Sequence, residues 1–244
     1  MGALYTNTTG GNNTANGADA LYSNTTGNEN TAVGFSALYL NNGSDNTAMG
    51  LNALFGNTTG SNNTASGAST LFSNTTGNNN TACGAFALWG NTTGYFNTAS
   101  GSLALYSNNG FNNTASGFGA LGLNTTGSSN TADGLLALLH NTTGSNNIAI
   151  GFSAGTNLTI GSGNIDIGNA GVAGESNTIR IGTTQSSAFV AGVRNAVVTG
   201  GVTVYAAANG QLGTNPSSER FKHQIRDMGK ASEAILALRP VTFR

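Results

Sequence analysis

The chain has 244 residues and a formal net charge of −1, and 7% of its residues are charged, against roughly 25% in typical soluble domains. Disorder normally combines high charge with few apolar residues, whereas 38% of this chain is apolar and 37 residues are Gly, so we expect an ordered, backbone-dominated structure. No Lys or Arg precedes Arg180, which argues against a nucleic-acid surface in the long first part. Cys83 is the single cysteine, which excludes a disulfide framework, and no run approaches the ~18 apolar residues of a membrane span.

A short repeat dominates the chain from its start. Asn-Thr-Ala begins at residues 13, 30, 46, 63, 80, 97, 113 and 130, and Asn-Ile-Ala begins at 147. The steps are 16 or 17 residues, and both short steps coincide with Asn-Asn-Gly in place of Asn-Thr-Thr-Gly, which places a turn there. The unit is too short for two packed helices, and Asn, Thr and Gly are poor helix formers. The sequence therefore predicts an all-β, repetitive β-solenoid (β-roll) of 16–17-residue coils over residues 1–146.

Stacked coils explain why the repeats are so uniform. Asn amides in one column can hydrogen-bond along the stack, whereas like charges at that spacing repel one another. We expect one Leu column and one Ala column to form a thin core. The Leu column is Leu4, Leu21, Leu38, Leu54, Leu71, Leu88, Leu105, Leu121 and Leu138, and the Ala column is Ala15, Ala32, Ala48, Ala65, Ala82, Ala99, Ala115 and Ala132. So narrow a core buries little apolar surface per residue.

An aromatic column directly follows the Leu column. Its members are Tyr5, Tyr22, Tyr39, Phe55, Phe72, Trp89 and Tyr106, and it continues into Gly122 and Leu139. The rings either pack, inside the coil or against a partner chain, or form an exposed ladder for sugars or surfaces, and we favour packing. A row of large apolar groups on a thin-cored solenoid favours oligomers, and a cyclic homotrimer would cover it.

The pattern changes beyond residue 146. Over residues 147–182, Ile replaces Thr and alternates as it does in strands, and the step from Asn164 to Asn177 shortens to 13 or 14 residues, which predicts a β-roll of shorter coils. Residues 183–216 lack the period and predict a β-rich neck or connector. We expect turns at Gly200-Gly201 and Asn209-Gly210.

The final segment, residues 217–244, predicts a short C-terminal α-helix. Asp227 can cap its N-terminus and Pro240 ends it, while Ala234, Ile235 and Leu238 share one face.

Two segments resemble known families. Asn-Ile-Ala-Ile-Gly-Phe-Ser-Ala-Gly from residue 147 and Asn-Thr-Ile-Arg-Ile-Gly from residue 177 resemble the left-handed β-roll heads of trimeric autotransporter adhesins and related phage and bacterial tail-fibre proteins. Residues 217–244 resemble the opening of the endosialidase-type intramolecular chaperone that ends trimeric tail spikes and fibres. The matching residues are Ser217, Arg220, Lys222, Leu238, Pro240, Val241 and Phe243.

The second resemblance implies a self-cleaving domain. Such a chaperone trimerises its chain, folds the upstream β-structure and then cuts itself off. By resemblance Ser217 is the nucleophile and Lys222 its base, with cleavage between Ser217 and Ser218; a Lys whose pKa is lowered by burial can activate a Ser. Because residues 217–244 match only the opening of that domain, we expect the pair to be inactive in this chain.

These patterns predict a structural protein rather than an enzyme. The repeats contain no carboxylate pair, no Ser-His-Asp set and no metal-ligand cluster, so we expect no cofactor and no metal. We expect the shaft or head of an extracellular trimeric fibre, at a cell surface or on a virion, with itself and a host-surface glycan or receptor as partners. The alternative is a repeat-surface binding module for polysaccharide or ice, presenting the Thr column from Thr14 to Thr131.

Overall fold

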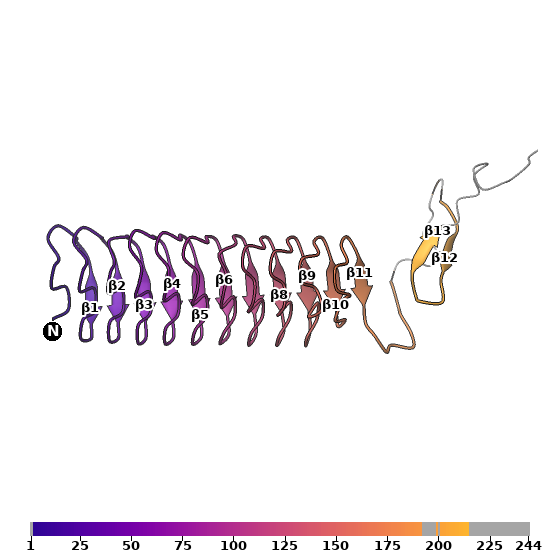
Figure 1. Cartoon of the computed structure of the whole chain (residues 1–244), viewed down its shortest axis with the longest axis horizontal. Coiled ribbons are helices and arrows are strands. Elements are labelled where there is room, and N and C mark those ends of the chain that lie inside the picture. The colour runs from indigo at the N-terminus through magenta and orange to yellow at the C-terminus, as the bar shows by residue number, and fades with distance from the viewer. Residues whose placement is uncertain (1, 192–198, 200, 215–244) are drawn as a thin grey trace, which may run out of the picture. The chain divides into compact units, whose positions relative to one another are not determined.

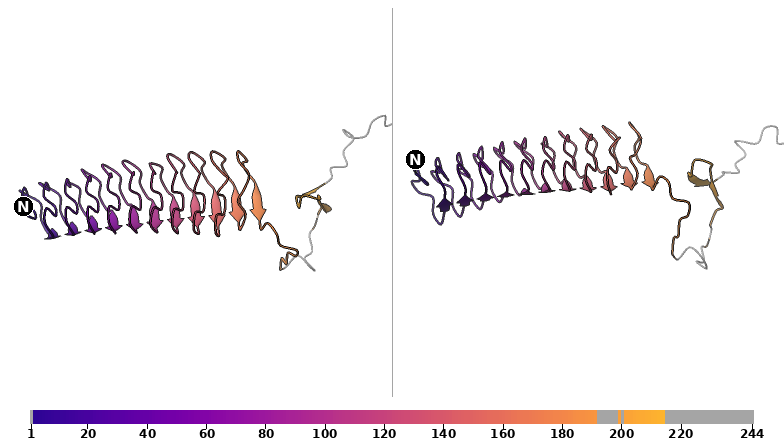
Figure 2. Two further views of the ribbon diagram at one scale, coloured as in Figure 1. Left: turned by 60° about the horizontal axis from the view of Figure 1, so that its bottom comes forward. Right: turned by 90° about the horizontal axis from the view of Figure 1, so that it is seen from below.

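The computed structural model describes residues 2–191, 199 and 201–214, and the chain divides into two compact units, Met1–Ser186 and Ser187–Arg244. The first unit is a parallel β-solenoid in which eleven strands form one sheet in sequence order (Figure 1). The strands are β1 Thr14–Asn16, β2 Thr31–Val33, β3 Thr47–Met49, β4 Thr64–Ser66, β5 Thr81–Cys83, β6 Thr98–Ser100, β7 Thr114–Ser116, β8 Thr131–Asp133, β9 Ile148–Ile150, β10 Ile165–Ile167 and β11 Ile179–Ile181. Figure 2 shows that the strands line one side of the solenoid and loops form the opposite side.

The register of the sheet follows the repeat. Thr14 pairs with Thr31 and Ala15 with Ala32, and the same pairing continues to β8. The steps are 16 or 17 residues as far as β10 and fall to 14 only between Ile165 and Ile179. The predicted β-roll at 147–182 therefore continues the same sheet without a break at residue 146.

The core is the predicted pair of columns with one addition. From Leu21 and Ala32 onward both columns are fully buried, while Leu4 and Ala15 pack against them half-buried. From Leu21 onward the residue before each Leu is also buried, which gives a second Ala column from Ala20 to Ala154 that is interrupted only by Thr70. Glycine ends each strand because a Cβ at Gly50, for example, would lie 2.5 Å from the carbonyl oxygen of Gly67 in the next coil.

The Leu column has an unusual backbone conformation. All nine Leu residues have φ between 50° and 54°, in the left-handed region that costs a non-Gly residue about 1–2 kcal/mol. Ser36 and Leu38 both have this conformation, with Ala37 between them, and their amides donate to opposite neighbouring coils. Ser36 N donates to Ala18 O in the coil before, and Leu38 N donates to Ala53 O in the coil after, each at 2.9 Å. In the coil after Leu138 the equivalent residue is Gly155, with φ of 63°.

Two buried columns of Asn side chains run along the solenoid. In the first, the Asn of each Asn-Thr-Thr-Gly turn donates from Nδ2 to Oδ1 of the Asn one coil earlier; Asn74 to Asn57 measures 2.7 Å. The same Nδ2 closes its own turn, as Asn74 does on Gly77 O at 3.0 Å. This turn ladder comprises Asn7, Asn24, Asn41, Asn57, Asn74, Asn91, Asn108, Asn124 and Asn141.

The second column, the strand ladder, consists of the Asn that precedes each strand. Asn80 Oδ1 accepts both Asn97 N and Asn97 Nδ2, at 3.0 and 3.1 Å, and Asn80 Nδ2 donates to Gly94 O at 2.9 Å. Identical amides one coil apart thus satisfy one another where water cannot reach, as the sequence predicts.

The described part of the second unit is a hairpin. β12 (Val204–Ala206) pairs antiparallel with β13 (Leu212–Thr214) around the predicted turn at Asn209-Gly210. All its described residues are exposed, including Val204 at 59% and Leu212 at 70%.

The all-β solenoid class is confirmed, and the residues that the structure describes contain no helix. The predicted C-terminal helix from Asp227 to Pro240 lies outside the described residues.

Candidate binding surface

The aromatic column forms a continuous stack on the outside of the coils. Consecutive rings from Tyr5 to Tyr106 have centroids 5.0–6.0 Å apart and planes within 3–9° of parallel. Tyr5 is 70% exposed, and the other six rings are half-buried. We call these seven residues the aromatic ladder. We expected the rings to pack either inside the coil or against a partner chain. Packing inside the coil is wrong, because the adjacent Leu fills the interior and the aromatic residue that follows it faces the opposite side.

The strand side of the solenoid presents two outward columns, one on each side of the buried Ala column. The first is the Thr column, which becomes Ile148, Ile165 and Ile179 in the last three strands. The other accepts many residue types, including Cys83, which is exposed and unpaired. Because the same position holds many other residue types in the neighbouring coils, the column gives no indication that Cys83 is a reactive thiol.

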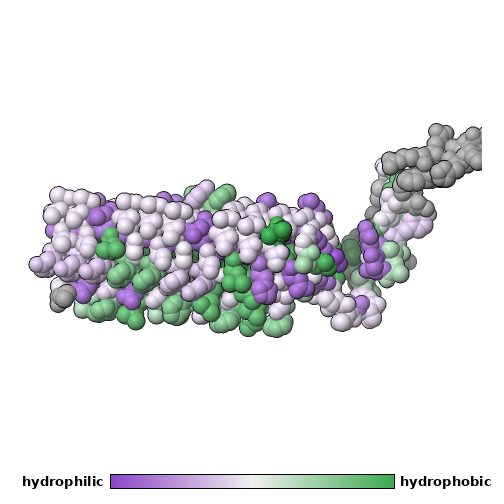
Figure 3. All heavy atoms as spheres, in the orientation of Figure 1, coloured by the Kyte–Doolittle hydropathy of each residue, from purple (hydrophilic) through white to green (hydrophobic). Residues whose placement is uncertain are grey.

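The last three strands turn this side apolar. Ile148, Ile150, Ile167, Ile179 and Ile181 are between 37% and 72% exposed, and we call them the isoleucine face. Hydrophobic side chains also gather along the edge where the strands end, the lower edge in Figure 3. Exposed residues that follow strand-ending glycines include Phe35, Leu51, Phe118, Leu135 and Phe152.

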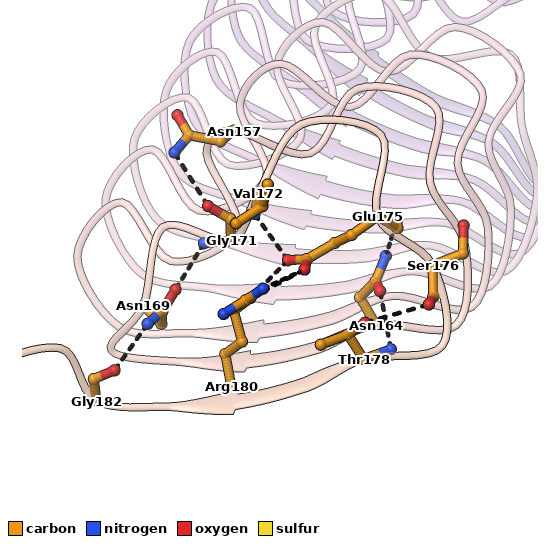
Figure 4. A network of polar contacts seen from close by, with 10 residues as sticks. All are labelled: Asn157, Asn164, Asn169, Gly171, Val172, Glu175, Ser176, Thr178, Arg180 and Gly182. Carbon is orange, nitrogen blue, oxygen red and sulfur yellow. Dashed lines mark hydrogen bonds and ion pairs between the residues drawn. The ribbon is translucent and has the colours of Figure 1, made fainter. Parts of the chain in front are cut away.

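Charged side chains gather in the last coils, at β10 and in the coil that leads to β11, and Figure 4 shows two of them, Glu175 and Arg180, pointing toward one another. Asp166 pairs in register with Ala149 on one side and Arg180 on the other, so its carboxylate occupies the Ala column and is fully buried. Neither carboxylate oxygen has a hydrogen-bond partner. Burial above all, and then the negative charge of Glu175, raise the pKa of Asp166 to about 6, against the lowering effect of Arg180.

Arg180 and Glu175 form an ion pair that closes the shortened coil. Arg180 Nη2 lies 2.7 Å from Glu175 Oε2, and Glu175 Oε1 accepts Val172 N at 2.7 Å. The hydrogen bond from Arg180 lowers the pKa of Glu175 below its usual value. The pair ties residue 175 to β11.

The predicted catalytic pair, Ser217 and Lys222, lies outside the described residues. Among residues 2–191, 199 and 201–214, no group of three or more His, Cys, Asp or Glu side chains is placed to hold a metal ion. Within that same part of the chain, no helix has the length and apolar character to cross a membrane. His140 is exposed, and its Nδ1 lies 2.8 Å from Thr156 O.

Two features of this surface were not anticipated. The buried Asp166 could have been found by aligning Asn164-Ile-Asp-Ile-Gly with Asn147-Ile-Ala-Ile-Gly, which puts an acid in the Ala column. The Arg180–Glu175 pair had no periodic signal, because it arises from the loop that shortens the coil.

Comparisons with protein-family models, with curated proteins and with solved structures find no match to this chain.

Proposed function

We propose that this chain is a structural segment, shaft or head, of a homotrimeric extracellular fibre of the phage tail-fibre or bacterial surface-adhesin kind. It projects from a virion or a cell surface and serves attachment. The protein-specific support is mechanical: the coils are bonded to their neighbours through the sheet and the loops, and two side-chain ladders add to these bonds as far as Asn141. Such a thread carries load along its axis and has almost no charge to repel an identical neighbour.

The observation that carries the trimer proposal is the isoleucine face. Ile179 and Ile181 are 66% and 72% exposed on a sheet side that is polar in most earlier coils. The face consists of aliphatic side chains only, so an apolar surface without charge is its fitting partner, and a second copy supplies one. A threefold arrangement also suits the second unit, whose described hairpin buries no side chain, because an isolated two-stranded hairpin is marginal in water.

Analytical sedimentation of the whole chain tests the trimer. We expect a trimer at micromolar concentration, and we expect Ile150→Asn combined with Ile181→Asn to dissociate it. Ser100→Asn is the matched control, since it places the same polar side chain in the same outward column of β6, away from the face. A monomeric wild-type chain at micromolar concentration contradicts the trimer, and so does a double variant that associates like the control.

Self-cleavage belongs to the same proposal. Where the complete chaperone domain is present, Ser217 attacks the peptide bond to Ser218 with Lys222 as base. Mass spectrometry of such an extended chain tests this: release of the C-terminal part should stop in Ser217→Ala, and unchanged release rules the assignment out.

The second candidate function is a repeat-surface binding module for polysaccharide or ice. The specific observation in its favour is the outward position of the aromatic ladder, whose rings lie at regular spacing on the surface of a single chain. Glycan-array binding that is lost in Tyr22→Ala/Tyr39→Ala supports it. Thermal hysteresis that is lost in Thr64→Val/Thr81→Val supports the ice version. Absence of both leaves the fibre proposal alone.

A further inference from the structure

The aromatic ladder has one missing rung. After Tyr106 the next member of the column is Gly122, and the one after that is Leu139. In the same coil the column two residues before the Leu column also holds a glycine, Gly119, whereas the other coils from Asp19 to Ser153 carry Asp, Ser, Asn, Phe or Leu there. Two outward side chains are therefore absent from a single coil.

Their absence leaves a hollow of about 260 Å³ that is one coil deep. Gly119 and Gly122 form its floor. Tyr106 and Leu103 form one wall from the coil before, and Leu139 and Leu136 form the other from the coil after. The backbones of the two walls belong to coils two steps apart, which is about twice the ~4.8 Å spacing of strands. The side chains of Leu136 and Leu139 lean over the floor, and Leu139 Cδ1 lies 3.2 Å from the position that a Cβ on Gly122 would take.

The two-step separation of the backbones accommodates one inserted ring once the flexible Leu139 side chain rotates away from Gly122. Rings in the ladder stack at about one coil step, and Trp89 lies 5.1 Å from Tyr106 with planes 6° apart. A planar ring placed over Gly122 can continue this geometry, stacking on the free face of Tyr106 and contacting Leu139 on its other side. The exposed side chains of Phe118 and Leu123 flank the opening.

The lining also decides the chemical class of the occupant. None of the eight lining residues carries a charge, and the Tyr106 hydroxyl is their single polar side-chain group. The backbone of the floor is already paired, since Gly122 N donates to Gly119 O at 3.0 Å and Gly122 O accepts Ser107 N at 3.2 Å. A sugar would find few partners for its hydroxyl groups here, whereas an aromatic ring needs none.

We infer that the hollow at Gly122 is a binding site for a small, uncharged planar aromatic molecule, held between Tyr106 and Leu139. This inference does not depend on the fibre proposal. The site is separate from the isoleucine face, because all its residues lie between Leu103 and Leu139.

Binding of p-cresol to the whole chain, followed by calorimetry or ligand-observed NMR, tests the inference. We expect saturable binding with a Kd on the order of 1 mM or tighter, as suits a ligand of this size. The matched ligand is 4-methylcyclohexanol, which has the same heavy atoms and hydroxyl but a puckered ring, and it should bind at least fivefold more weakly.

Variants locate the site. Gly122→Phe supplies the missing ring from the chain itself and should weaken p-cresol binding at least tenfold. Gly122 has no positive φ, and an added Cβ would lie 3.1 Å from Gly119 O, 3.2 Å from Leu139 Cδ1 and 3.6 Å from Leu103 O, so the substitution requires a small shift of the Leu139 side chain and of the backbone at Gly119. Should it perturb the solenoid in circular dichroism, Tyr106→Leu takes its place: it keeps the hollow apolar and should remove the preference for the planar ligand.

Ser69→Asn is the control, because Ser69 occupies the column of Gly119 three coils earlier, and it should leave the Kd within twofold of wild type. Three results would overturn the site: no saturable p-cresol binding by the wild-type chain, equal binding by Gly122→Phe, or equal affinity for the puckered ligand.

Discussion

The coils of β1–β8 and the coils of β9–β11 bury polar groups in different ways. In the first region each buried Asn meets an identical Asn one coil away, and both amides are satisfied, as Asn80 and Asn97 are. The turn ladder ends at Asn141, in the last coil of the first region, because the next coil has Leu158 in that place, and Asn141 Oδ1 has no partner. In the second region Asp166 is buried without a partner. A buried polar column is therefore stable as long as the repeat continues, and it leaves orphaned groups where the sequence changes.

The largest effect is expected from breaking the turn ladder in its middle. Asn74→Ala leaves Asn57 Oδ1 without a donor and removes one of the two acceptors of Asn91 Nδ2, so we expect a loss on the order of 3–4 kcal/mol in the free energy of unfolding. Asn141→Ala is the matched change at the ladder's end, where no amide donates to the side chain. It should cost about 1 kcal/mol less. Urea denaturation followed by circular dichroism measures both, and equal losses would contradict the ladder account.

The next effect concerns pH. The pKa of Asp166 is raised to about 6 from 3.8, so the folded chain holds this proton more tightly than the unfolded chain does. The resulting stability is fully present below about pH 4 and is lost as the pH rises through about 6, by roughly 3 kcal/mol. Arg180 and Glu175, which act on the same carboxyl group, are included in that shift.

Asp166→Ala restores the Ala column and should remove this loss. We expect the variant to be more stable than the wild type at pH 8 and to lose the stability difference between pH 4 and pH 8. Asp133→Ala, on the exposed side of β8, is the control and should keep the pH dependence. A destabilised Asp166→Ala at pH 8 would show that Asp166 has a partner there.

A smaller effect distinguishes two buried Leu residues. Leu88 has φ of 51°, where a branched Cβ is strongly disfavoured, so Leu88→Ile should cost about 2 kcal/mol or more. Leu158 is equally buried but has no positive φ, and Leu158→Ile should cost less than about 1.5 kcal/mol. Thermal or urea unfolding of the two variants gives the comparison, and equal costs would mean that the left-handed backbone imposes no constraint.

The sequence was sufficient for what depends on the repeat. The 16–17-residue step predicted the coils of the solenoid, and the columns placed Leu88 and Ala82 inside. The repeat also predicted the stacking of identical Asn amides, because equivalent residues of successive coils in a solenoid are neighbours.

Features outside the repeat were harder to derive. The left-handed conformation of the Leu column runs against the preference of Leu, and its one sequence signal is Gly155. The direction of the aromatic ladder depends on that conformation, which explains why inward packing was a wrong expectation. Ser217, Lys222 and the helix from Asp227 stay predictions.

The central claim is that equivalent residues in successive coils lie one strand spacing apart along a single axis. Pulsed electron–electron spin resonance tests it with one label on Cys83 and a second on a cysteine placed at residue 16, 133, 167 or 181, in the same outward column. The doubly labelled chain is diluted with unlabelled chain, so that the measured distances are those between two labels on one copy. The account predicts that the distance grows by about 4.8 Å for each intervening coil step, regardless of the residues between. Distances that do not rise linearly with the number of coils would contradict it.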